Sequence, residues 1–222
     1  MTARGRTIEL PIFPLPGVVF FPRVILPLHI FEPRYRAMVA SALDGNGRIG
    51  MVLLREGWRS QYHASPPVFG TGTMGLITQP EELEDGKYNL LLRGLQRYQI
   101  LEFLQETPFR LARVRLLEDV APDERDAQAL RWKMAKRLNQ LAPEIKFPPL
   151  EPKLAGRIDF LTMINLICCC LDLSVYDKQR LLETGDLAVR ARGVLGVLDR
   201  KLKAKKLVSG FQTLRPEHPE RN

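Results

Sequence analysis

The sequence is poor in the residues that bind metals or form disulfide bonds. Its three cysteines are consecutive, from Cys168 to Cys170, and its three histidines, His29, His63 and His218, are far apart. Neighbouring residues on a helix point about 100° apart, so consecutive thiols cannot share one metal ion as a CxxC pair does. We therefore expect reduced, buried, structural thiols, no metal, no cofactor and a cytoplasmic protein.

Long apolar runs are also missing. The most apolar stretch, residues 160–173, is interrupted by Asn165 and Asp172 and is too short to cross a bilayer. The first nine residues are polar and contain neither the apolar core nor the small-residue cleavage site of a secretory signal. These absences predict a protein without a membrane partner.

Motifs for catalysis and nucleotide binding are absent or incomplete. The sequence contains no GxxxxGK[ST] phosphate loop, so an ATPase is not supported. A GxGxxG string at residues 70–75 lies within a strand pattern that no helix follows, whereas a dinucleotide site needs a helix there. Ser174 and Lys178 have the spacing of a Ser-Lys dyad, but Asp177 makes Ser174 a helix cap instead. We therefore expect no catalytic residue.

The composition is that of a folded, basic protein. Hydrophobic residues make up 45% of the chain and charged residues 26%, which is enough apolar material for a core and excludes low-complexity disorder. The net charge of +8 favours anionic partners but does not indicate a fold.

The first half of the sequence is predicted to be rich in β-strands. One helix begins at Pro33, where Tyr35, Met38, Val39 and Ala42 form an apolar stripe at helical spacing. Strong turn signals and a bend at Gly94 favour a small, closed or partly closed barrel. The expected strands cover residues 8–14, 24–28, 48–54, 70–78, 88–103 and 110–117.

The second half is predicted to form a helical bundle. Asp123, Ser174 and Asp186 are placed to cap three of its helices. Residues 154–171 are apolar on most sides, which predicts the central helix. The predicted fold class is α+β, divided into a barrel domain (1–120), a helical bundle (121–208) and a flexible tail (209–222).

Three segments carry a family resemblance. They are LPIFPLPGVVFFPRVILPLHIFEPRY at residues 10–35, VFGTGTMGLI at 68–77 and LLRGLQRY at 91–98. In this order they resemble the N-terminal, substrate-binding domain of Lon proteases. The resemblance implies a PUA-like β-barrel with one helix, followed by a helical bundle.

The resemblance also implies a function. In Lon proteases this region recognises and holds protein substrates and helps to assemble the oligomer, without peptidase activity of its own. The sequence resembles a freestanding form that lacks the ATPase and peptidase domains. We therefore expect a non-enzymatic module that binds unfolded or client proteins, with a separate protease or further copies of itself as other partners.

Aromatic residues are the first candidates for such a binding site. Most are expected to fill the barrel core, but some can line an apolar groove for extended polypeptide. Trp58 and Tyr62 are the preferred candidates because a loop pattern surrounds them. The full set of candidate substrate-binding residues is Phe20, Phe21, Phe31, Tyr35, Trp58, Tyr62 and Phe69.

A basic stretch at the end of the last helix supports an alternative. These cations either form a solvated face that complements the helix dipole or contact RNA, as in other PUA-like proteins. Nucleic acid is the less favoured partner because the aromatics are not interleaved with the cations. The residues concerned are Arg200, Lys201, Lys203, Lys205 and Lys206.

Overall fold

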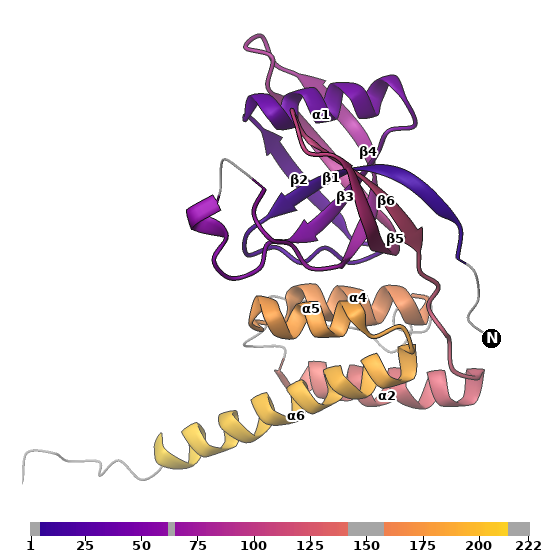
Figure 1. Cartoon of the computed structure of the whole chain (residues 1–222). Helices are drawn as coiled ribbons and strands as arrows, with labels where there is room; N and C mark the ends of the chain where they lie inside the picture. The colour runs from indigo at the N-terminus through magenta and orange to yellow at the C-terminus, as the bar shows by residue number, and fades with distance from the viewer. Residues whose placement is uncertain (1–4, 62–64, 142–157, 213–222) are drawn as a thin grey trace, which may run out of the picture.

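A β-barrel lies on a layer of helices in the computed structural model, which describes residues 5–61, 65–141 and 158–212 (Figure 1). Helix α1 lies across the barrel, and α6 runs along the helical layer and beyond it (Figure 1). The strands are β1 (Thr7–Leu15), β2 (Ile25–Ile30), β3 (Arg48–Leu53), β4 (Thr71–Glu82), β5 (Tyr88–Gln105) and β6 (Arg110–Leu116), and the helices are α1 (Pro33–Asp44), α2 (Glu124–Leu141), α4 (Phe160–Cys170), α5 (Val175–Glu183) and α6 (Leu187–Gln212), with a one-turn 3-10 helix η1 (Trp58–Gln61). The predicted α+β class, a barrel with one helix followed by a helical bundle, is confirmed.

Five strands close the barrel and one stays at its side. β1 pairs in parallel with β3 and antiparallel with β6, and β6 also pairs with β5, which closes the ring through β4. The register between β4 and β5 shifts between Met74 and Gly75, opposite Gly94, so the bend predicted at Gly94 is a bulge. β2 pairs with β5 and, among the described strands, with no other.

The barrel core forms between α1 and the strands. Pro33 opens α1, and the predicted stripe of Tyr35, Met38, Val39 and Ala42 is buried. These side chains share one apolar cluster with strand residues such as Ile49. Helix α1 therefore covers the barrel with the face that its sequence predicts.

The helical half follows the predicted caps. Asp123 Oδ1 accepts a hydrogen bond from the Asp126 amide at 2.8 Å, and Asp186 Oδ1 accepts one from the Val189 amide at 3.0 Å. The predicted helix over residues 154–171 is described only from Phe160, since residues 142–157 lie outside the described ranges. The sequence places the start of the tail at residue 209, but α6 continues through Gln212.

Barrel and helices share apolar and polar contacts. Val19, Phe21 and Leu53 of the barrel half belong to one apolar cluster with helix residues. Asn165 Nδ2 donates to the Pro22 carbonyl oxygen at 3.0 Å, and Gln179 Nε2 donates to the Thr71 carbonyl oxygen at 2.9 Å. The boundary between the two halves at residue 120 stays a prediction.

A buried charged network joins the same two halves. Asp119, in the connection between β6 and α2, accepts hydrogen bonds from Arg97 Nε at 2.8 Å and from Arg190 Nη2 at 2.7 Å. Arg190 is fully buried and also donates to Asn165 Oδ1 at 3.0 Å. Burial lowers the pKa of Arg190, and the Asp119 carboxylate opposes that shift. We refer to Arg97, Asp119, Asn165 and Arg190 as the junction network.

None of the described helices is both long enough and apolar enough to span a membrane.

Candidate functional site

Three of the aromatic residues proposed for substrate binding are buried rather than exposed. Phe20 is 3% exposed, Phe21 0% and Tyr35 6%. Phe20 and Tyr35 belong to the barrel core, where the ring centroid of Tyr35 lies 4.5 Å from that of Phe13. Phe21 belongs to the cluster shared with the helices. Burying these large rings stabilises the barrel. Of the three, Phe20 alone also lines the apolar groove described below.

The remaining aromatic candidates lie on different elements. Phe31 is 57% exposed, between β2 and α1. Trp58 is partly buried on η1 rather than in an irregular loop. Phe69 is partly buried, with its ring centroid 6.2 Å from that of Tyr176 on α5. Tyr62 lies outside the described residues. The candidates that the structure describes therefore do not form one aromatic site.

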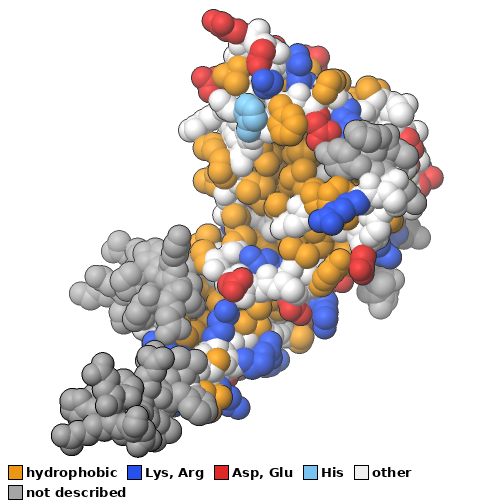
Figure 2. Space-filling view, turned by 90° about the vertical axis from the view of Figure 1, so that its left-hand side faces the viewer, with side chains coloured by type: hydrophobic (Ala, Val, Ile, Leu, Met, Phe, Trp, Pro, Cys, Tyr) orange, Lys and Arg blue, Asp and Glu red, His pale blue; other side chains and the backbone are white. Residues whose placement is uncertain are grey.

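An apolar groove lies between the barrel and the helices. It has a volume of about 360 Å³. One wall comes from the β1–β2 connection and the start of β2, and the other from the end of α4 and the start of α5. Figure 2 shows hydrophobic side chains gathered on the β2 side of the barrel and continuing towards the helical layer. The apolar groove is lined by Gly17, Val18, Val19, Phe20, Val24, Ile25, Leu26, Cys169, Leu173, Val175 and Lys178.

The open edge of β2 runs from this groove. β2 pairs through Ile25–Ile30 with Tyr88–Arg93 of β5, and its other edge meets no described strand. Apolar side chains remain exposed at both ends of the edge, with Ile25 58% and Phe31 57% exposed. A single apolar side chain at the surface is ordinary, but a groove continuous with the free edge of a strand is a typical peptide-binding feature.

Sequence signals for this site exist. Apolar side chains lie on both faces of one short strand, at Val24, Ile25, Leu26 and Leu28. Such a pattern is typical of a strand that makes apolar contacts on each face. Pro27 lies within that run, and proline inside a strand is typical of a sheet edge because it donates no ladder hydrogen bond. Together they indicate an edge strand with an apolar outer face.

Polar groups near the groove are engaged in structural hydrogen bonds. Ser174 Oγ accepts from the Asp177 amide at 3.1 Å and donates to Asp177 Oδ2 at 2.7 Å, so the predicted helix cap is confirmed. Lys178 Nζ instead donates to the Cys169 carbonyl oxygen at 2.9 Å, at the end of α4. The lysine therefore does not activate Ser174, and the pair is not a catalytic dyad.

The cysteines near the groove are poor nucleophiles. Burial raises the pKa of Cys168 to about 12 and that of Cys169 to about 11, so both thiols stay protonated at neutral pH. Cys168 is buried as predicted, whereas Cys169 is only partly buried and Cys170 is exposed. Over the described parts of the chain, His, Cys, Asp and Glu form no group able to hold a metal ion. The lining of the apolar groove is therefore dominated by apolar side chains.

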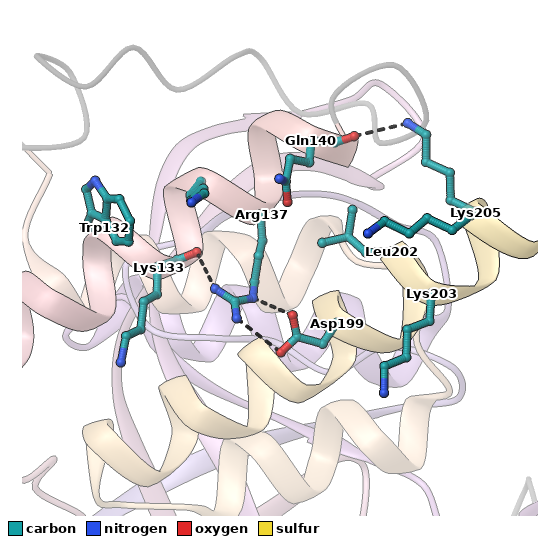
Figure 3. Close-up of a pocket in the computed structure, with 10 residues that line it drawn as sticks. Trp132, Lys133, Arg137, Gln140, Asp199, Leu202, Lys203 and Lys205 are labelled. Atoms are coloured by element: carbon teal, nitrogen blue, oxygen red, sulfur yellow. Dashed lines mark hydrogen bonds and ion pairs between the residues drawn. The ribbon is translucent and has the colours of Figure 1, made fainter. Parts of the chain in front are cut away.

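A second groove lies between α2 and α6 and is strongly basic (Figure 3). Its volume is about 760 Å³. The predicted basic residues Lys203, Lys205 and Lys206 line it, whereas Arg200 and Lys201 do not. Sequence reasoning missed the contribution of α2, including Trp132, which is 62% exposed. The basic groove is lined by Trp132, Lys133, Lys136, Arg137, Gln140, Asp199, Leu202, Lys203, Lys205 and Lys206.

Comparisons with known proteins agree on one family. A model of the ATP-dependent protease La (LON) substrate-binding domain matches residues 9–200. The Lon protease of Anaeromyxobacter dehalogenans is 31% identical over 203 residues, which cover 89% of this chain and 24% of that protein. Lon protease 2 of Myxococcus xanthus is 32% identical over 203 residues, with the same coverage of 89% and 24%. The chain therefore spans about a quarter of the length of these relatives.

Two solved structures share the fold. A Lon N-terminal domain protein from Xanthomonas campestris superposes with a TM-score of 0.59 at 21% identity, covering 85% of this chain and 98% of that one. The N-terminal domain of a Mycobacterium avium complex Lon protease superposes with a TM-score of 0.64 at 17% identity, covering 86% and 98%.

Proposed function

This chain belongs to the Lon substrate-binding domain family, and from that premise we propose that it holds unfolded client polypeptide in the apolar groove and along the open edge of β2. The observation that carries the proposal is the continuity of the two features, because Ile25 belongs to both. The module acts by binding and catalyses no reaction.

The apolar groove supports selection for non-native chains. Folded proteins bury their large apolar side chains, whereas unfolded chains expose them and gain free energy by placing them against apolar walls. The lining contains one charged side chain, Lys178, and its ammonium group already bonds the Cys169 carbonyl oxygen. Binding here should therefore depend little on salt.

The edge of β2 supports recognition of extended backbone. A peptide added beside an open strand forms main-chain hydrogen bonds that do not depend on its sequence. Pro27 lacks an N–H group and interrupts this row of donors, which limits the strength of such pairing. We therefore expect the site to bind clients of many different sequences and to release them readily.

The partners follow from this mode of binding. The clients are proteins that expose apolar, extended segments, and we expect the encounter to occur in the cytoplasm. A separate protease that accepts the released client, or a second copy of this chain, is a further partner. A second copy that paired through β2 would compete with the client, so dimerisation would weaken client binding as protein concentration rises.

Fluorescence anisotropy tests the proposal with a labelled client. Lysozyme that has been reduced and blocked with iodoacetamide is a suitable probe, since it is unfolded and basic and is not attracted to the basic groove. We expect it to bind, with an affinity that changes less than twofold between 50 and 500 mM salt, while native lysozyme does not bind.

Paired variants locate the site. Ile25→Asp with Val175→Asp places a charge on each wall of the apolar groove, and Asp at the start of α5 suits the helix dipole. We expect binding at least tenfold weaker. Val189→Asp, an exposed apolar residue in the first turn of α6, is the matched control and should bind as wild type does. Unchanged binding by the folded double variant would refute the assignment.

A further inference from the structure

We propose that the basic groove is a second, independent site and that it holds single-stranded nucleic acid. The client site described above draws on the barrel, α4 and α5, whereas the described residues of this groove all belong to α2 and α6. A substitution that disrupts one of the two grooves can therefore leave the other intact.

The charge of the basic groove favours an anionic ligand. Among the described residues, six cationic side chains line the groove against the single carboxylate of Asp199, and Arg137 engages this carboxylate in an ion pair. Over the described residues, Lys133 and Lys203 form no ion pair, and Figure 3 shows both at the groove. Like charges gathered in one groove repel each other, and an anionic ligand relieves that repulsion.

The arrangement of these cations suits a chain of phosphates. Lys133, Lys136 and Arg137 follow one another at helical spacing on one face of α2, and Lys203 and Lys206 do so on α6. The two helices pack side by side, so the cations form two rows along the groove rather than one cluster. Its volume of about 760 Å³ is far more than a single phosphate ion fills.

Trp132 distinguishes nucleic acid from an acidic peptide. Its side chain is 62% exposed and lies off the buried face of α2 formed by residues such as Leu130 and Met134. The Lys136 ammonium lies 5.0 Å from the ring centroid, so the exposed ring stands directly among the cations. Unpaired bases stack on such rings, and stacking with a basic groove is the usual combination in single-strand binding proteins. Carboxylate side chains do not stack on an aromatic ring, so an acidic peptide would gain nothing from Trp132.

Polarisation of fluorescent oligonucleotides tests this proposal. We expect a 12-nucleotide oligouridine and an oligothymidine of equal length to bind, and a polyglutamate of similar charge to bind at least tenfold more weakly. Tighter binding of one oligonucleotide identifies RNA or DNA as the natural ligand. Equal binding supports recognition of the phosphates and bases that RNA and DNA share. Trp132→Leu, which keeps apolar bulk without a ring, should lower the affinity about tenfold.

The salt dependence identifies the phosphate contacts. Lys133→Gln with Lys203→Gln should lower the slope of log affinity against log salt by about 1.4, since each phosphate contact to a single strand contributes about 0.7. Arg125→Gln with Arg192→Gln is the matched control, because both residues are exposed on α2 and α6 but outside the groove. We expect this control to leave the slope within about 0.3 of wild type.

Three results would overturn the proposal. One is equal loss of affinity in the control and in the groove variant, which would mean that net charge alone drives binding. Another is polyglutamate binding as tight as oligouridine binding with no effect of Trp132→Leu, which identifies an acidic-protein site. The third is no oligonucleotide binding at 50 mM salt. None of these results bears on the unfolded lysozyme probe, so failure here is separable from failure of the client site.

Discussion

The apolar groove and the basic groove differ in what holds their walls together. The apolar groove takes one wall from the barrel half and the other from α4 and α5, so it exists only while the two halves keep their relative position. The basic groove lies within the helical half, between two helices that pack directly on each other. Changes at the junction between the halves should therefore affect the first groove and spare the second.

Asp119→Asn should have the largest effect. It removes the carboxylate that, among the described residues, neutralises both Arg97 and Arg190 in the junction network, and an uncompensated buried charge costs about 3–5 kcal/mol. Urea unfolding should show this loss, and binding of unfolded lysozyme should weaken while oligouridine binding persists. Asp123→Ala removes an exposed helix cap and serves as the control, with an expected loss of about 1 kcal/mol. Equal losses from the two substitutions would contradict the role of the junction network.

Gly94→Ala should have the next largest effect. The added Cβ would lie 2.4 Å from the Phe21 carbonyl oxygen, in the β1–β2 connection that forms one wall of the apolar groove. Displacing that connection costs about 1–3 kcal/mol. Client affinity should fall with stability, whereas Gly70→Ala meets no neighbour within 4 Å and should change neither. Client binding that survives in Gly94→Ala would show that this wall is not required.

Alkaline pH should weaken the interior of α4 selectively. Burial raises the pKa of Cys168 from 9.0 to about 12, so the folded state keeps a proton that the unfolded state loses. The stabilising contribution of the protonated thiol is complete below pH 9 and is lost as the pH rises towards 12. At pH 10 the loss in the free energy of unfolding is about 1 kcal/mol. The free energy of unfolding should therefore fall between pH 8 and pH 10, and less steeply in Cys168→Ala. Identical slopes would contradict the burial of this thiol.

Lys178→Met should have the smallest effect. It removes the only charged side chain of the apolar groove together with its hydrogen bond to the Cys169 carbonyl oxygen. Stability should fall by about 1 kcal/mol or less, and client affinity should stay the same or rise by less than threefold, because the groove becomes more apolar. A tenfold loss of client affinity, measured by anisotropy, would show that the lysine binds the client directly.

Local patterns predicted local structure well. The stripe that starts at Tyr35, the caps at Asp123, Ser174 and Asp186, and the bend at Gly94 depend on residues close in sequence, and the structure confirms each. The resemblance carried by residues 10–35 identified the family, which the comparisons confirm.

The binding surfaces were harder to predict because they depend on distant residues. Phe20 and Phe21 lie in a connection rather than a strand, and no local period indicates that this connection folds onto the barrel and the helices. The pairing of Asp119 with Arg190 joins positions 71 residues apart. Pro27 within β2 and Trp132 off the buried stripe of α2 were the available signals for the two grooves.

Amide hydrogen exchange on the full chain tests the central claim most directly. Exchange is followed with and without saturating unfolded lysozyme, in peptides that cover β2 and the start of α5. We expect slower exchange over residues 24–31 and 173–178, with α2 and the end of α6 unchanged. Unchanged exchange over residues 24–31, or protection confined to α2 and α6, would contradict it.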